Sequence, residues 1–219
     1  MYPFIRTFLL IGFLGLGLVH SGCKEEAEKE KQLVISTSYG DITIALYNST
    51  PKHRDNFIKL VESGFYDDLL FHRVIDNFMI QGGDPASKTA PAGTVLGGGG
   101  PGYEIDAEIG APHLRGALAA ARKPSAEKKS SGSQFYIVTG TRVTEQELQQ
   151  IEMSKKIKYN DVQRKLYLEN GGYPNLDMEY TVFGEVVSGI DVADKISKLE
   201  KDARDRPIND VRMKIKIIN

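Results

Sequence analysis

The sequence predicts a mainly β domain in which eight antiparallel strands close into a barrel that is capped by two α-helices. Three observations lead to this fold class. Short runs of alternating or apolar residues recur along the chain, two segments have the apolar spacing of helices, and strands and helices do not alternate regularly. The last observation argues against a parallel doubly wound sheet. Closure into a barrel would remove the edges that eight strands otherwise expose.

The composition is that of an ordinary globular protein. The 219 residues are 41% hydrophobic and 26% charged, and the formal net charge is -1. Such a balance offers no basic surface, so we expect no nucleic-acid partner. A single cysteine and four histidines without metal-ligand spacing exclude a disulfide framework and a multi-cysteine metal site. We therefore expect neither a metal nor a cofactor.

The first 22 residues have the pattern of a signal peptide. Arg6 precedes an apolar run at 8–19, which is too short to span a bilayer but has the length of the apolar region of an export signal. Weaker alternatives are a buried helix, ordinary secretion or an uncleaved anchor.

Cys23 follows two small residues, as in the lipobox of bacterial lipoproteins, although His20 stands where that motif usually has an aliphatic residue. We expect Cys23 to be lipidated and residues 23–32, which are mostly charged, to form a tether. The protein would then be extracytoplasmic and anchored to a bacterial membrane, on the periplasmic face of an outer membrane or at the cell surface. Residues 33–219 would form one domain.

The strands and the first helix are predicted from periodicity and from turn residues. Residues 33–46 hold two β-rich runs around a Ser-Tyr-Gly-Asp turn. Thr50 and Pro51 have the residue types of a helix cap and a first helical position, and Gly64 ends that helix. Further strand candidates are 71–75, 78–81, 116–121, 134–139, 181–187 and 211–218. Helical spacing between the last two predicts the second capping helix, with an apolar stripe of Val192, Ile196 and Leu199.

A helical insertion is predicted at 142–172. Thr144 and Glu147 fit a capping box, and the segment is rich in Glu, Gln, Lys and Leu. One or two surface helices are expected, with Asn160 and Asp161 as the place where the segment would break. The role of this insertion is left open, and one possibility is a docking surface for an envelope partner.

The segment 71–84, FHRVIDNFMIQGGD, is the most informative for function. It has the pattern of a strand, a tight turn and a second strand, with Arg73, Phe78, Met79 and Gln81 able to project to one side. Apolar side chains beside a few directed donors are typical of a ligand pocket. A surface arginine over a core pair fits these residues equally well.

Two other motifs have structural rather than functional interpretations. The glycine run at 97–102 matches the dinucleotide fingerprint in letters, but Pro101 interrupts it and no helix pattern follows, so a glycine-rich loop is predicted. His72 lies among apolar neighbours and is interpreted as a core or rim histidine rather than a metal ligand.

The segment FHRVIDNFMIQGGD closely resembles the central motif of the cyclophilin family of peptidyl-prolyl cis-trans isomerases. The likeness extends from Val34 to Ile218, and its further motifs follow in the family's order: YGDITIALY, GGGGPGYEIDAE, HLRGALAAAR, SSGSQFYIVTG and YTVFGEVVSGIDVADKI. The resemblance implies the eight-stranded barrel with two helices. It also implies an isomerase that acts on proline-containing polypeptides, and we expect a monomer.

The resemblance implies a role for individual residues. Arg73 would be the catalytic arginine, and the substrate-binding residues would be Phe78, Met79, Gln81, Ala121, Gln134, Tyr136, Leu176 and Tyr180. Tyr136 stands where the family usually has Phe, and Tyr180 replaces a His. Asn175 stands where many eukaryotic members have a Trp associated with cyclosporin binding, so drug affinity should be weak. Arg122 replaces an Asn on the substrate groove.

We therefore predict a peptidyl-prolyl isomerase that stabilises the twisted amide without covalent chemistry and serves exported or envelope proteins. The alternative is a module that binds proline-containing segments or unfolded chains without turnover.

Overall fold

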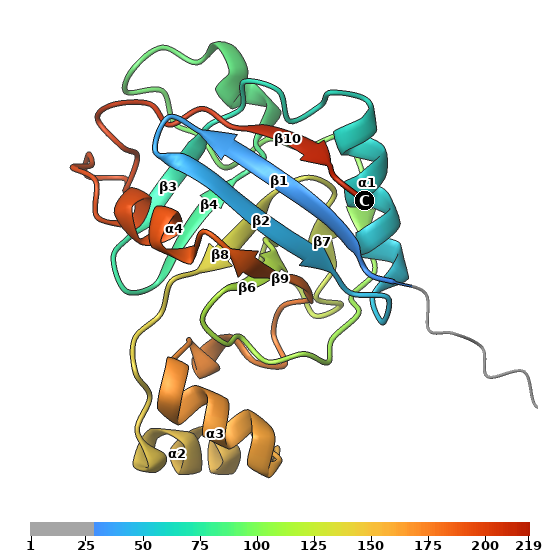
Figure 1. Cartoon of the computed structure of the whole chain (residues 1–219), viewed down its shortest axis with the longest axis vertical. Helices are drawn as coiled ribbons and strands as arrows, with labels where there is room; N and C mark the ends of the chain where they lie inside the picture. Colours follow the sequence, from blue (N-terminus) through green and yellow to red (C-terminus); the bar gives the residue numbers. More distant parts are fainter. Residues whose placement is uncertain (1–28) are drawn as a thin grey trace, which may run out of the picture.

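The computed structural model describes residues 29–219, and its centre is a curved eight-stranded antiparallel sheet (Figure 1). The strand order is β10-β1-β2-β9-β6-β8-β4-β3. The strands are β1 (Lys31–Thr37), β2 (Gly40–Leu46), β3 (Phe71–Ile75), β4 (Met79–Gly82), β6 (Ala117–Ala120), β8 (Phe135–Val138), β9 (Val182–Ser188) and β10 (Lys214–Ile217). A small second sheet pairs β5 (Glu104–Ile105) with β7 (Ser130–Ser131).

Two helices cap the sheet and two form an insertion. The caps are α1 (Pro51–Glu62) and α4 (Ile190–Ser197), which lie toward opposite ends of the sheet in Figure 1. The insertion contains α2 (Glu145–Lys155) and α3 (Asp161–Asn170), and two 3₁₀ turns are η1 (Pro85–Thr89) and η2 (Pro174–Leu176). Thr50 is the N-cap of α1 as predicted, but its hydroxyl donates to the Tyr47 carbonyl and caps no helix amide.

The central strands are buried on both faces. We call the face that carries the second apolar cluster, with Met79, Tyr136 and Val138, the functional face. Side chains of a strand alternate between the two faces of its sheet. In β8, Phe135 and Ile137 enter the main core with the apolar faces of α1 and α4, whereas Tyr136 and Val138 join a second cluster on the other face. β4 divides in the same way, with Ile80 in the main core and Met79 in the second cluster.

The predicted closure of the barrel is not confirmed, and the sheet forms a half-barrel. β3 and β10 are its edge strands and do not pair with each other along their length. The two edges meet through a single bridge between Leu70 and Arg212 and through neighbouring backbone hydrogen bonds, such as Met213 N to Leu69 O at 2.8 Å. The contact involves residues that flank the strands, so it does not make a continuous ladder.

The insertion forms two helices, with the predicted cap at Thr144 and a break at the predicted place. Thr144 and Glu147 make the capping box of α2, and Asn160 and Gln163 make a second capping box at the start of α3. The pair projects from the sheet at the bottom of Figure 1 and has its own small apolar core. That core contains Val143, Leu148, Ile151, Tyr159 and Tyr167.

The predicted signal peptide, Cys23 and the rest of the predicted tether up to residue 28 lie outside the described residues. The tether ends earlier than predicted, because Lys31 and Gln32 belong to β1 and pair with β2. Within residues 29–219, none of the helices combines the length and the apolar character that a membrane crossing requires.

Candidate functional site

A small cavity of about 130 Å³ lies on the functional face of the sheet. We call it the slot. Its lining contains eight of the nine residues that the sequence placed in a catalytic or substrate-binding role: Arg73, Phe78, Met79, Gln81, Ala121, Tyr136, Leu176 and Tyr180. Arg122 completes the lining, and Gln134 lies in the cavity next to it. The pocket interpretation of the 71–84 segment is therefore favoured over a surface arginine.

The β3–β4 hairpin brings the first slot residues together. Its tight turn places Asn77 in the left-handed region at φ 58°. Antiparallel pairing then sets Arg73 opposite Gln81, and β8 places Tyr136 on the far side of Gln81. The Phe78 ring is held from outside by the Tyr173 ring, with centroids 4.3 Å apart. Local turn geometry and strand register thus fix the slot.

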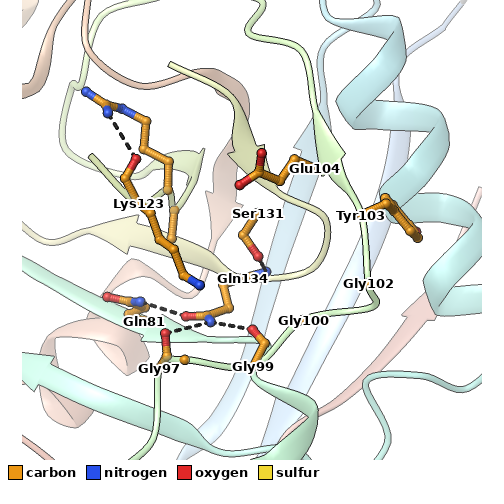
Figure 2. Close-up of a pocket in the computed structure, with 13 residues that line it drawn as sticks. Gln81, Gly97, Gly99, Gly100, Gly102, Tyr103, Glu104, Lys123, Ser131 and Gln134 are labelled. Atoms are coloured by element: carbon orange, nitrogen blue, oxygen red, sulfur yellow. Dashed lines mark hydrogen bonds between the residues drawn. The ribbon is translucent and has the colours of Figure 1, made fainter. Parts of the chain in front are cut away.

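A line of amide hydrogen bonds runs from the slot into the neighbouring cavity. Arg73 Nη1 donates to Gln81 Oε1 at 3.4 Å, and Gln81 Nε2 donates to Gln134 Oε1 at 3.1 Å. Gln134 Nε2 in turn donates to the carbonyl oxygens of Gly97 at 3.0 Å and Gly99 at 2.7 Å (Figure 2). This line fixes both glutamine side chains at the edge of the groove.

The neighbouring cavity has a volume of about 310 Å³ and shares Gln81, Ala121 and Arg122 with the slot. Figure 2 shows the glycine run forming one of its walls. The run is a loop, as predicted, and no helix follows it. Sequence reasoning interpreted it only as a glycine-rich loop and assigned it no part in the site. The loop is held by the buried Asp84, whose Oδ2 accepts from the amide of Gly97 at 2.6 Å.

The guanidinium of Arg73 retains donors for a ligand. Its Nε lies 3.7 Å from Asp205 Oδ2, its Cζ lies 6.0 Å from the centre of the Phe78 ring, and 40% of the side chain is exposed. Since a guanidinium has five N–H donors, these contacts and the one to Gln81 leave several unused within the described residues. The adjacent His72 is buried, and burial lowers its pKa to about 4, so it adds no charge at neutral pH.

Arg122 forms a fixed rim above the slot. Its Nε donates to the Glu179 carbonyl at 2.7 Å, its Nη2 lies 3.1 Å from the Glu179 carboxylate, and its Cζ lies 4.8 Å above the Tyr180 ring. Tyr180 meets Tyr136 edge to face, with centroids 5.9 Å apart. Asn175, by contrast, is exposed and lines a separate cavity beside α2.

Sequence reasoning also missed His113 and Asp177, which lie behind Tyr136. The Tyr136 hydroxyl is 2.9 Å from His113 Nε2, and His113 Nδ1 is 2.9 Å from Asp177 Oδ1. The only signal in the sequence was a tyrosine where a phenylalanine is usual. Among residues 29–219, no group of three or more His, Cys, Asp or Glu side chains is arranged to hold a metal ion.

Comparisons with known proteins agree on one family. Residues 32–217 match the family model of cyclophilin type peptidyl-prolyl cis-trans isomerase/CLD. A Staphylococcus haemolyticus protein assigned as a peptidyl-prolyl cis-trans isomerase is 34% identical over 189 residues, which cover 86% of this chain and 91% of the relative.

Solved structures give the same result. A crystal structure of a Cryptosporidium parvum cyclophilin type peptidyl-prolyl cis-trans isomerase matches with a TM-score of 0.62 at 27% identity, covering 87% of this chain and 98% of that one. A second structure of that protein, in the presence of the dipeptide Ala-Pro, matches with a TM-score of 0.59 at 27% identity, covering 86% and 99%.

Proposed function

The chain belongs to the family of cyclophilin-type peptidyl-prolyl cis-trans isomerases, and we propose that its slot catalyses rotation of Xaa-Pro bonds in exported or envelope proteins. The observation that supports this proposal is the composition of the slot. An arginine with unused donors lies beside a small apolar cavity. The Cryptosporidium relative was crystallised in the presence of Ala-Pro, which supports a proline-containing ligand here.

The reaction requires no covalent step. The cis and trans forms of an Xaa-Pro bond differ by about 0.5–1 kcal/mol. The barrier between the forms of a peptide bond is about 18–20 kcal/mol, because rotation interrupts resonance between the nitrogen and the carbonyl. A catalyst therefore needs only to bind the twisted amide more tightly than either planar form.

The slot residues divide this task. The apolar side chains hold the proline ring, so that it stays fixed while the preceding carbonyl rotates. They are Phe78, Met79, Tyr136 and Leu176. Arg73 then donates to the amide as conjugation is lost, through the nitrogen, the carbonyl oxygen or both. A guanidinium suits this role because it is always charged and its donors lie in one plane.

The line of amides positions the rest of the substrate. Gln81 lies between Arg73 and Gln134, so it is within reach of the residue that precedes the proline. The neighbouring cavity, which continues past Ala121, would accept residues that flank the proline. Its lining carries both Glu104 and Lys123, so it does not select one sign of charge.

The test is the refolding of a protein whose slow phase is limited by prolyl isomerisation, a step that takes tens of seconds without catalyst. We expect the chain to accelerate that phase in proportion to its concentration, and excess Xaa-Pro peptide to suppress the acceleration. If refolding yield rose while the slow rate stayed constant, the chain would be a binding module and the proposal would be wrong.

We further propose that lipidated Cys23 anchors the protein to a bacterial membrane on its extracytoplasmic side, as a monomer, with residues 24–30 as a spacer before β1. The supporting observation is the small-residue pair before the only cysteine, directly after an apolar run. Cys23→Ser should move the protein from the membrane fraction to the soluble fraction of the producing cell. Unchanged fractionation of Cys23→Ser would contradict lipid anchoring.

A further inference from the structure

A buried chain of polar groups runs from the helical insertion to the slot. Tyr159 and Tyr167 both place their hydroxyls 2.6 Å from Asp177 Oδ2. The other carboxylate oxygen lies 2.7 Å from the His113 amide and 2.9 Å from His113 Nδ1. His113 Nε2 then lies 2.9 Å from the Tyr136 hydroxyl. All five side chains are buried, and we call the chain the relay.

Donors and acceptors in the relay can be assigned in one consistent direction. Burial raises the pKa of Tyr136, Tyr159 and Tyr167 well above the usual value, so all three phenols keep their protons. Tyr159 and Tyr167 therefore donate to the carboxylate. Since Nδ1 of His113 faces the same carboxylate, it carries a proton, and Nε2 accepts from Tyr136. Every polar side-chain atom of the relay has a partner.

The two ends of the relay belong to different parts of the fold. Tyr159 lies between α2 and α3 and Tyr167 lies in α3, so both belong to the core of the insertion. Tyr136 is a strand residue whose ring lines the slot. The hydrogen bonds of the relay therefore meet the slot at Tyr136.

The base of the insertion is bonded to the segment that carries His113, because Tyr173 N donates to the His113 carbonyl at 2.8 Å. Gly172 N donates to the Thr141 carbonyl at 2.9 Å, which closes the two ends of the insertion on each other. Gly171 has φ +84°, and a Cβ there would lie 2.1 Å from the Thr141 carbonyl oxygen. The helices are therefore held in a fixed position relative to the relay.

We propose that the insertion positions the Tyr136 ring for prolyl isomerisation through the relay, with Asp177 and His113 as positioning residues. The proposal rests on the assignment of the slot as the isomerase site. A phenylalanine at position 136 would need no hydroxyl partner, whereas a buried phenol without one is unfavourable. The position of the Tyr136 ring thus depends on the hydrogen bonds made by the insertion. Substitution of either Tyr159 or Tyr167 would therefore change the position of a side chain that lines the slot.

A double-mutant cycle in the full chain separates this role from a general effect on folding. Asp177→Asn replaces one acceptor oxygen with a donor group, and we expect kcat/KM for an Xaa-Pro peptide to fall about tenfold. In a Tyr136→Phe background the relay has no hydrogen bond to the ring. The same Asp177→Asn change should then alter kcat/KM less than about twofold. A loss of about tenfold in both backgrounds would overturn the proposal.

Changes at the distant end provide a second test that does not depend on Asp177. The Tyr159→Phe and Tyr167→Phe pair removes both phenols from the carboxylate and leaves every slot residue in place. We expect the ring signals of Tyr136 in NMR spectra of the full chain to shift, and kcat/KM to fall about threefold or more. Tyr47→Phe is the matched control, because it removes a phenol that bonds to the Glu185 carboxylate outside the relay.

The outcomes distinguish the two proposals. If the Tyr136 signals did not shift in the chain that carries both Tyr159→Phe and Tyr167→Phe, the proposed role of the relay would be wrong. The proposed function would be unaffected, because the wild-type chain would still catalyse isomerisation. A wild-type chain without activity would refute the proposed function. The NMR comparison would still show in that chain whether the insertion controls the ring.

Discussion

Replacement of Arg73 by alanine should reduce activity far more than stability, and the structure gives the size of both effects. Within the described residues the guanidinium makes a 3.4 Å hydrogen bond to Gln81, a 3.7 Å ion pair with Asp205 and a 6.0 Å contact with the Phe78 ring. Long, partly exposed ion pairs contribute about 0–1 kcal/mol. Arg73→Ala should therefore lower the free energy of unfolding by less than about 1 kcal/mol.

The expected loss of rate is much larger. Removal of one preorganised donor from a transition state costs roughly 2.7–4 kcal/mol, which corresponds to about 10²–10³ in rate. Arg73 is the donor that we place beside the twisted amide, so Arg73→Ala should lower kcat/KM for a short Xaa-Pro peptide by about 10²–10³. Peptide isomerisation followed spectroscopically gives kcat/KM, and urea unfolding of the same preparation gives the stability.

Two companion variants sharpen the result. Arg73→Lys keeps the charge but loses the planar set of donors, so it should recover only part of the rate. Arg204→Ala removes one positive charge from an exposed residue of a cavity that Arg73 also lines, and it should keep activity within about twofold. Full activity in a folded Arg73→Ala chain would refute the role of this arginine.

Three further predictions concern the groove, the insertion and pH. Gln134→Leu removes the amide that joins Gln81 to the glycine loop. We expect kcat/KM to fall about tenfold and the free energy of unfolding to fall by roughly 1–3 kcal/mol in urea titrations. Unchanged kinetics would contradict the positioning role of Gln134. Gly171→Ala places a Cβ against a backbone carbonyl at a residue with positive φ. The free energy of unfolding measured in urea titrations should therefore fall by roughly 1–3 kcal/mol. Gly98→Ala is the control and should have no effect on stability, because a Cβ at Gly98 meets no atom within 4 Å. The folded-state pKa of His72, about 4, lies below its unfolded value of about 6.5, so the unfolded chain binds the proton first as the pH falls. The free energy of unfolding should then decrease by up to about 3 kcal/mol between pH 6.5 and 4, and urea titrations of His72→Gln should lack that part of the slope.

The sequence was most informative where local rules decide the structure. Alternation along β3 and β4, with a tight turn between them, predicted that Arg73 and Gln81 share one face, and strand register makes them direct neighbours. Capping residues predicted the start of α2, because a cap is a local hydrogen bond. The Asn160 cap of α3 was not predicted as a cap, although Asn160 was expected at a break. Thr50 is the exception, since its hydroxyl is used for a turn carbonyl.

Features that depend on distant segments could not be predicted. The half-barrel is open because the edge strands β3 and β10 meet only near Leu70 and Arg212. The periodicity of a strand shows which of its faces is buried but not which strands pair at the edges of the sheet. The glycine loop forms a wall of the site because Asp84 and Gln134 hold it, and these residues lie far from it in sequence. The role proposed for His113 depends on its contacts with Asp177 and Tyr136, which the spacing of residues does not reveal.

The most direct test of the central claim is two-dimensional exchange NMR of a short Xaa-Pro peptide with a catalytic amount of the wild-type chain. Uncatalysed cis and trans signals exchange over tens of seconds. We predict exchange cross-peaks at mixing times below about one second, which is roughly ten to a hundred times shorter. Peptide signals that shift on binding but show no faster exchange would contradict it.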